Sequence, residues 1–245
     1  MAELIHPLPA TSGDKILGEP RKILAGRPAL VVVDIQQGGA APASESGIAV
    51  MDGYAEMAAR AELLVSAARA AGLPVIFVQE LHRPDGVDFG RELDGDEGIH
   101  CVEGAAATEL WPTLRPGPGD YYVPKRRYSA FFGTDMDILL RGLRSESLIL
   151  IGSLTDVCIH YTFVDAHQRD FHTRVVEDCV IGSSRAAHEA SLAAMEYLQH
   201  GARCTTEEVL AELHQVELHQ VELHQVELHE RTPVGMGAPT TTGAL

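Results

Sequence analysis

The chain has 245 residues and a formal net charge of −16 at pH 7, from 35 acidic and 19 basic side chains. Nucleic acid and anionic membrane surfaces are excluded as expected partners, because both repel an acidic protein. Hydrophobic residues make up 45% of the sequence, and no apolar run approaches the roughly 20 residues that span a bilayer.

The four cysteines, Cys101, Cys158, Cys179 and Cys204, lie far apart and form no C-x-x-C pair. This spacing argues against a disulfide framework or a metal knuckle and suits a reducing compartment. Residues 1–22 lack a continuous hydrophobic segment with a cleavage site, so we expect no secretory signal and a cytoplasmic protein.

Short β-branched runs alternate with stretches of helical spacing along most of the chain. The predicted strands cover residues 29–35, 73–79, 121–124, 148–151, 173–177 and 203–205. The predicted helices cover residues 51–71, 134–143, 159–169 and 184–200, and a Thr205–Glu208 capping box opens a last one. This alternation predicts an α/β fold, a three-layer α-β-α sandwich with a mostly parallel, Rossmann-like sheet of about six strands.

The chain divides into an arm over residues 1–27, a domain over residues 28–213 and a tail over residues 214–245. Within the domain, residues 80–118 are irregular and rich in charge and glycine. A loop of this length is typical of a lid, a binding loop or a contact with a neighbouring subunit, and the sequence leaves these open.

The tail contains Gln-Val-Glu-Leu-His three times over, in residues 215–229. A five-residue period advances about 140° per repeat on a helix, so the apolar side chains leave any single face and the histidines diverge. We therefore predict a low-complexity, partly helical extension that carries no chemistry, followed by disorder over residues 230–245.

The most informative stretch is Ser-Leu-Ile-Leu-Ile-Gly-Ser-Leu-Thr-Asp-Val-Cys, residues 147–158. It predicts a buried strand that stops at a glycine, followed by a helix that Ser153, Thr155 and Asp156 cap and that Cys158 opens. Backbone N–H groups and the helix dipole would favour a thiolate there and would stabilise an oxyanion. An inert buried cysteine is the alternative that this stretch leaves open.

Asp34 and Lys125, like Cys158, fall at or just after the end of a predicted strand. In a parallel sheet these ends share one edge, where ligands bind. Taken singly, Asp34 is equally a strand-end cap and Lys125 equally a solvated surface charge.

Three segments together resemble the signatures of the isochorismatase-like cysteine hydrolases, in the family's order. They are Val-Val-Val-Asp34-Ile-Gln36, Val-Pro-Lys125-Arg-Arg-Tyr-Ser-Ala-Phe and Gly152-Ser-Leu-Thr155-Asp-Val-Cys158. The resemblance implies a triad in which Cys158 is the nucleophile, Asp34 exchanges protons and Lys125 keeps Asp34 ionised. It also implies a cis Ser153–Leu154 peptide and an oxyanion hole formed by the backbone N–H groups of Leu154 and Cys158.

The presence of a nucleophilic cysteine distinguishes branches of this family. By family pattern, true isochorismatases cleave a vinyl ether and lack this cysteine. The Lys125 segment resembles that of ureidoacrylate- and carbamoyl-type amidohydrolases. The implied reaction is hydrolysis of a C–N bond in a small linear amide or ureido compound by a homo-oligomer, a dimer or tetramer. Ether hydrolysis and a non-catalytic binding role on the same fold remain alternatives.

Six residues near these motifs are predicted to bind substrate: Gln36, Glu80, His82, Tyr128, Ser129 and Phe131. For the aromatic residues among them, a plain packing role is an equal alternative. The arginines Arg83, Arg91 and Arg127 are candidates for holding a substrate carboxylate.

We expect no cofactor and no metal. Nicotinamidases of this superfamily hold zinc with an Asp-x-His pair and a later histidine. His82 matches the later histidine, but residues 37–53 contain no histidine at all, and a single ligand does not hold zinc. Cys101, Cys179 and Cys204 are expected to be inert.

Overall fold

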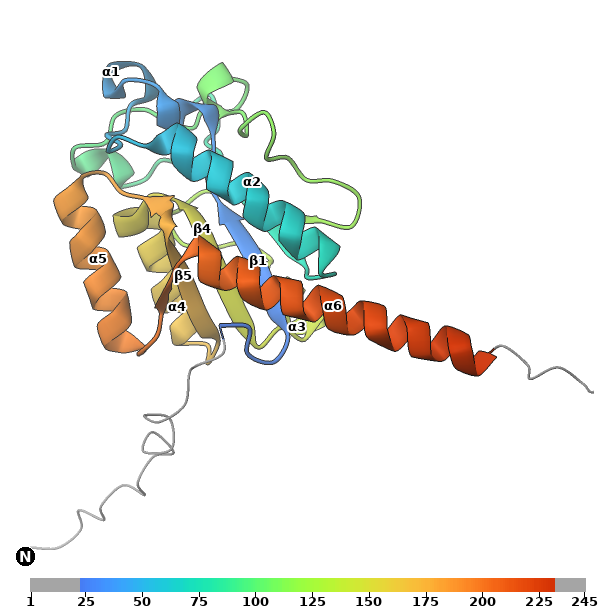
Figure 1. Cartoon of the computed structure of the whole chain (residues 1–245). Coiled ribbons are helices and arrows are strands. Elements are labelled where there is room, and N and C mark those ends of the chain that lie inside the picture. The colour runs from blue at the N-terminus through green and yellow to red at the C-terminus, as the bar shows by residue number, and fades with distance from the viewer. Residues whose placement is uncertain (1–22, 232–245) are drawn as a thin grey trace, which may run out of the picture.

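The computed structural model describes residues 23–231. Six strands form one sheet: β1 Pro28–Val33, β2 Val75–Glu80, β3 Tyr121–Lys125, β4 Ser147–Ser153, β5 His172–Ile181 and β6 Arg203–Cys204. Their order is β3-β2-β1-β4-β5-β6, and every neighbouring pair is parallel. The predicted α/β sandwich with six strands is confirmed (Figure 1).

Helices cover both faces of this sheet. They are α1 Ala43–Ser46, α2 Tyr54–Ala70, α3 Met136–Leu143, α4 His160–His167, α5 Arg185–Leu198 and α6 Thr206–Arg231. Helices α2 and α6 pack on one face, and α3, α4 and α5 pack on the other. Three short 3-10 turns lie in the loops: η2 Gln37–Ala40, η3 Glu92–Asp94 and η4 Ala106–Thr108.

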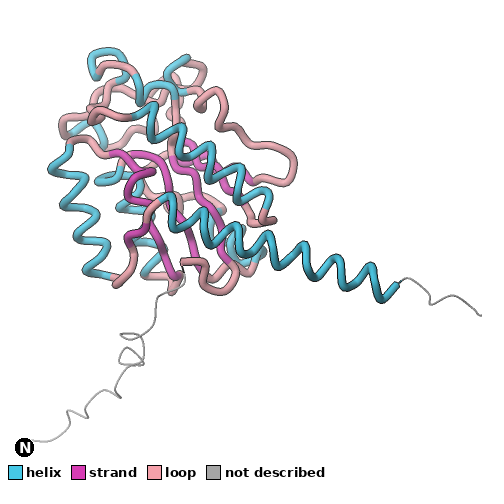
Figure 2. Tube along the Cα trace, in the orientation of Figure 1, coloured by secondary structure: helices cyan, strands magenta, loops and turns pink. Residues whose placement is uncertain are grey.

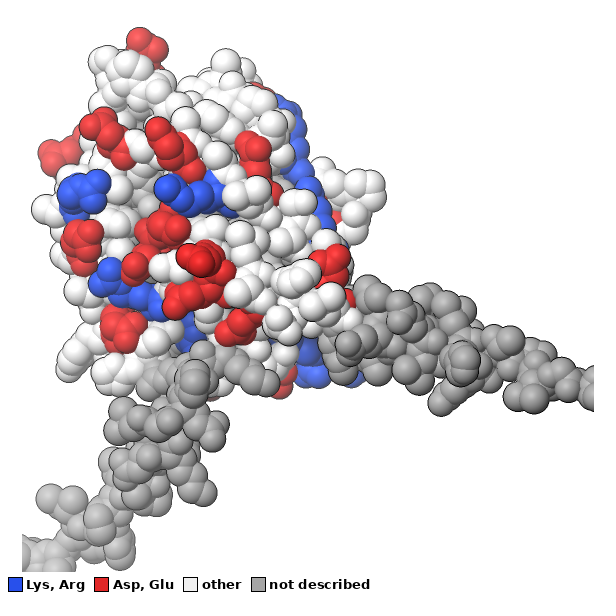
Figure 3. Space-filling view, viewed as in Figure 1, with Lys and Arg blue, Asp and Glu red and all other residues white. Residues whose placement is uncertain are grey.

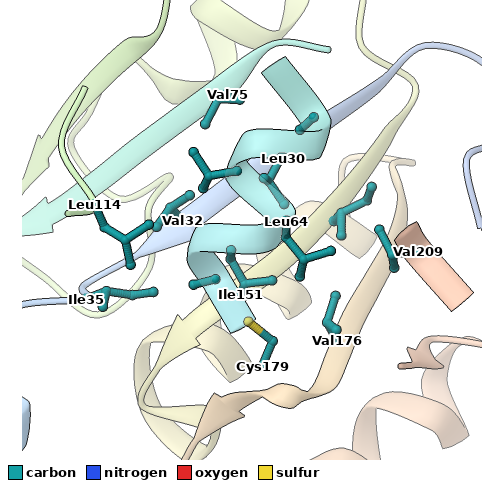
Figure 4. Packing of buried hydrophobic residues seen from close by; sticks show 14 of the residues in the cluster. Leu30, Val32, Ile35, Leu64, Val75, Leu114, Ile151, Val176, Cys179 and Val209 are labelled. Carbon is teal, nitrogen blue, oxygen red and sulfur yellow. The ribbon is translucent and has the colours of Figure 1, made fainter. Parts of the chain in front are cut away.

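The unbroken apolar run of β4 follows from this sandwich. Ile149 and Ile151 face the α2 and α6 side, whereas Leu148 and Leu150 face the opposite side. Successive strand side chains point to opposite faces, so a strand covered by helices twice is apolar throughout. On the α2 side, Leu64 reaches down to Ile151 (Figure 4).

Two adjacent leucines of α2 test this packing. Leu64 is fully buried, whereas 58% of Leu63 is exposed. We expect Leu64→Ala to lower the free energy of unfolding by about 2–5 kcal/mol, because it leaves a cavity in the core. Leu63→Ala is the matched control and should change it by less than about 0.5 kcal/mol. Urea unfolding followed by circular dichroism measures both, and equal losses would contradict the assignment of faces.

The chain beyond the predicted domain boundaries contributes to the core. The backbone N–H groups of Ile23 and Leu24 donate to the Glu212 carboxylate over 2.8 and 2.9 Å, and Ile23 is buried. Val216 of α6 packs against the same cluster. The boundary predicted after residue 213 therefore falls inside a helix.

Helix α6 begins as predicted and continues further than predicted. The Thr205 backbone N–H donates to the Glu208 carboxylate (2.8 Å), and the Glu208 N–H donates to Thr205 Oγ1 (3.3 Å). This capping box confirms the predicted start. The helix then runs through the whole repeat to Arg231 and extends beyond the sheet (Figure 1). Disorder was predicted over residues 230–245, but residues 230 and 231 are the last two of α6. The rest of that stretch, residues 232–245, lies outside the described residues.

Within residues 23–231, no helix has the length and apolar character needed to cross a membrane. On the face shown in Figure 3, acidic side chains lie among basic ones, and a row of basic side chains follows the right-hand edge.

The long connections after β1 and β2 contain η2, α1, η3 and η4 and gather at one end of the sheet (Figure 2). This end lies where the parallel strands finish, so the irregular residues 80–118 cover the predicted ligand-binding edge.

Candidate active site

Four neighbouring strands bring four reactive side chains to this edge. Asp34 follows β1 directly, Glu80 and Lys125 are the last residues of β2 and β3, and Cys158 lies in the turn after β4. Since these strands are parallel and adjacent, their carboxyl ends meet. The sheet thus collects side chains that are distant in sequence.

Lys125 lies at the centre of the group. Its Nζ atom is 2.8 Å from Asp34 Oδ2 and 3.3 Å from Cys158 Sγ, and it also pairs with Glu80 Oε2. Cys158 Sγ lies 3.4 Å from the same Glu80 oxygen. Lys125 is fully buried, so the surface-charge alternative is wrong for it. The structure brings the three predicted triad side chains together and adds Glu80 to them.

Burial and charge set the protonation of this group. Burial raises the pKa of Asp34 to about 6, although the Lys125 ammonium opposes this rise. Burial also raises the pKa of the Cys158 thiol, although the Lys125 ammonium opposes this rise. Burial alone would lower the pKa of Lys125, but the negative charges around it, Asp34 first, raise it. An ammonium therefore lies between carboxylates and the Cys158 sulfur.

The turn that carries Cys158 has two unusual features. The Ser153–Leu154 peptide is cis, as the family resemblance implies. A single π-helical turn, η5, covers Thr155–Ile159 before α4 begins. Cys158 therefore lies inside the turn, not in the first residue of an α-helix.

The predicted helix caps are wrong. Ser153 Oγ donates to the Asp34 carbonyl (2.8 Å), and Asp156 accepts from the backbone just before α5 (2.8 Å). Thr155 Oγ1 shares a 2.9 Å hydrogen bond with His188 Nδ1 of α5. These side chains tie the turn to β1 and α5, because a buried turn must satisfy its polar groups.

A pocket of about 540 Å³, its open mouth included, lies beside Cys158. Among the predicted substrate-binding residues, Gln36, Glu80 and Tyr128 line it. Three further polar lining side chains, Glu97, His100 and Cys101, come from the irregular residues 80–118, whereas Ser46, Tyr54 and Ser153 come from α1, α2 and β4. Cys101, expected to be inert, is thus part of the pocket wall.

The remaining predicted binding residues lie elsewhere. Ser129 Oγ donates to Asp165, and Phe131 packs in the core beside α3 and α4. His82 is fully buried behind the pocket and stacks on Phe89, with ring centroids 4.0 Å apart. The three arginines considered for a substrate carboxylate are also absent from the described lining.

His82 belongs to a buried cluster, so the argument that it stands alone is wrong. Its Nε2 atom lies 3.2 Å from Glu80 Oε1 and 3.1 Å from Glu92 Oε2, and His100 Nε2 lies 3.3 Å from Glu80 Oε1. Ligands about 2.0–2.2 Å from a tetrahedral cation lie roughly 3.3–3.6 Å apart. Neither carboxylate oxygen of Glu92 has a hydrogen-bond partner among the described residues, because the single Nε2–H of His82 cannot serve two carboxylates. This set fits a divalent cation.

We expect Zn²⁺ at about 100 times its dissociation constant to raise the melting temperature of the wild type by roughly 5–10 °C. Glu92→Gln should abolish this shift, because it removes a carboxylate ligand. Asp94→Asn is the control, since Asp94 lies on the same turn η3 and is exposed. A wild-type melting temperature that does not respond to Zn²⁺ would contradict metal binding by the cluster.

Known proteins resemble this chain both in sequence and in fold. The profile of the isochorismatase domain matches residues 28–209. The ureidoacrylate amidohydrolase of Pseudomonas savastanoi pv. phaseolicola is 33% identical over 182 residues, which are 65% of this chain and 73% of that protein.

Two solved structures share the fold. A cysteine hydrolase from Pseudomonas syringae pv. phaseolicola superposes with a TM-score of 0.67 at 28% identity, over 81% of this chain and 96% of the other. N-carbamoylsarcosine amidase from Thermoplasma acidophilum gives 0.59 at 28% identity, over 74% and 95%.

Proposed function

Because the chain belongs to the isochorismatase family, we propose that it is a cysteine amidohydrolase that cleaves a C–N bond of a small linear amide or ureido compound. The observation that carries this proposal is the convergence of Cys158, Asp34 and Lys125 beside a pocket. The names of the relatives, an amidohydrolase and a carbamoyl amidase, support C–N cleavage.

Acylation begins with the substrate carbonyl carbon next to Cys158 Sγ. Asp34 takes the thiol proton, and the sulfur forms a bond to that carbon. Glu80 is a poorer base, because its oxygens already contact Lys125, His82 and His100. Collapse of the tetrahedral intermediate breaks the C–N bond, and protonated Asp34 returns the proton to the leaving amine or ammonia.

Deacylation reverses these roles. Asp34 takes a proton from water as the water oxygen bonds to the thioester carbon; the C–S bond then breaks, the acid is released, and Asp34 returns the proton to the Cys158 sulfur. Leu154 and Cys158 both line the pocket. In both halves of the proposed reaction their backbone N–H groups donate to the developing oxyanion. Lys125 stabilises the negative charge as it moves between sulfur and carboxylate.

The buried cluster around His82 lies next to the Cys158, Asp34 and Lys125 group, and none of the steps above passes through a cation held there. A divalent cation held by Glu80, His82, Glu92 and His100 would add positive charge beside the carboxylate that contacts Lys125 and Cys158.

Ammonia release over a panel of ureido acids, alkylureas, biuret and nicotinamide tests the proposal. We expect steady release from at least one linear ureido or amide compound. Inactivity across the whole panel, with an intact fold, would favour a binding protein on the same scaffold. We further propose a homo-oligomer, a dimer or tetramer, in the cytoplasm, and light scattering measures that assembly.

A further inference from the structure

We propose that Glu97 selects the substrate, and that the pocket takes ureido or amide compounds whose remote end is rich in N–H groups, neutral or cationic, and not a carboxylate. This inference rests on the proposed function, because it concerns the same pocket. It departs from the relative named above, since ureidoacrylate is an anion.

The first observation is that the lining side-chain donors are already used. Both N–H groups of the Gln36 amide donate to backbone carbonyls, those of Glu80 (3.1 Å) and Thr108 (2.7 Å). The hydroxyls of Tyr54 and Ser153 donate to the Gln36 and Asp34 carbonyls, over 2.9 and 2.8 Å. A substrate carboxylate would need donors that these side chains cannot offer.

The second observation is that the cationic groups near the pocket are committed too. Lys125 is enclosed by Asp34, Glu80 and Cys158. His100 directs Nδ1 to the Gly98 carbonyl (2.7 Å) and Nε2 to Glu80 (3.3 Å). Both ring nitrogens of His100 therefore already have partners within the protein, and neither is directed at a ligand in the pocket. Among the described residues, no arginine lines the pocket.

The arginines near the pocket have other partners. Arg83 pairs with Asp88, Arg91 pairs with Asp94, and Arg127 donates to the Asp88 carbonyl. Each of these contacts lies outside the pocket lining. These three arginines therefore already bind acceptors outside the pocket.

Glu97 is the exception, because it presents an acceptor. It is half-buried in the pocket wall, and its Oε2 atom accepts a 3.1 Å hydrogen bond from Tyr128 Oη. Tyr128 in turn packs on Tyr161, with ring centroids 5.4 Å apart, which fixes the carboxylate. Within residues 23–231, Glu97 Oε1 has no hydrogen-bond partner. A fixed carboxylate with a free oxygen attracts an ammonium or amide N–H and repels an anion.

Three ureido ligands with the same three-carbon chain separate these classes. They are 3-ureidopropionate, which is an anion, propylurea, which is neutral, and 3-ureidopropylamine, which is a cation. Calorimetry on the full-length Cys158→Ala variant measures their affinities without turnover. We expect the cation to bind at least 10-fold more tightly than the anion. Glu97→Gln should reduce that ratio to threefold or less, because the amide keeps the shape and loses the charge.

Asp96→Asn is the matched control, since Asp96 is an exposed carboxylate next to Glu97 and lies outside the pocket lining. It should leave the ratio unchanged. Tighter binding of the anion, equal binding of all three ligands, or a ratio unchanged by Glu97→Gln would overturn the inference. Turnover by the wild type is measured separately, so a pocket that binds the cation without hydrolysing any ureide would contradict the proposed function alone.

Discussion

Cys158→Ala is expected to reduce kcat/KM for the best amide substrate by about 10³-fold or more, since removal of a catalytic nucleophile costs up to about 10⁶-fold. In the proposed mechanism the sulfur is the atom that bonds to the substrate carbon, so its removal leaves no group that can form the acyl-enzyme. The variant should stay folded, because the side chain is small. Ammonia release and circular dichroism measure the two effects.

Cys179→Ala is the control for losing a buried cysteine. Cys179 lies in the core on the α2 side and is not one of the residues that line the pocket. Its replacement should lower stability and leave turnover intact. Ammonia release that survives Cys158→Ala would contradict the nucleophile role. Cleavage of a vinyl ether that survives it would instead favour the ether hydrolase alternative, whose chemistry needs no thiol.

Lys125→Met is expected to abolish turnover and to lower the free energy of unfolding by about 3–5 kcal/mol. The substitution leaves the buried carboxylates of Asp34 and Glu80 without a counter-charge. Two like charges in a dry site repel each other and lack water to stabilise them. Thermal unfolding measures the stability, and ammonia release measures the activity.

The double variant Lys125→Met/Glu80→Gln separates stability from catalysis. Removing one carboxylate together with the ammonium should restore much of the lost stability, whereas turnover should stay low, since Asp34 and Cys158 still lack the ammonium. A Lys125→Met variant as stable as the wild type, or an active double variant, would contradict the role given to Lys125.

The sheet and the reactive edge were predictable because each depends on local pattern. The apolar run around Ile149 has no period, which requires cover on both faces, and the alternation of elements requires parallel strands. Parallel strands in turn bring Asp34, Lys125 and Cys158 to one edge. No spacing in the sequence gives the distances among them, but the topology leaves few other arrangements.

The rest of the site depends on residues 80–118, where no period indicates which side chain faces inward. Glu92, Glu97 and His100 therefore gave no signal, and the cluster around His82 could not be predicted. Ser129 and Phe131 were misplaced for a related reason. Proximity to Lys125 in sequence does not say which way a side chain points after the strand ends.

The repeat in the tail is a third place where the structure differs from the prediction. The five-residue repeat was predicted to be only partly helical, because its apolar residues share no face. The structure continues α6 through it from a well-capped start that packs on the core through Val209 and Leu213. A strong nucleus can propagate a helix into residues that could not form one alone.

Mass spectrometry of the Cys158 peptide, after acid quench during turnover, shows whether the thiol forms a covalent bond to the substrate. We expect a fraction of chains in which Cys158 carries the acyl part of the substrate, and no such adduct on Cys101. Rapid turnover with an unmodified Cys158 at every quench time, together with full activity of Cys158→Ala, would contradict covalent catalysis by Cys158.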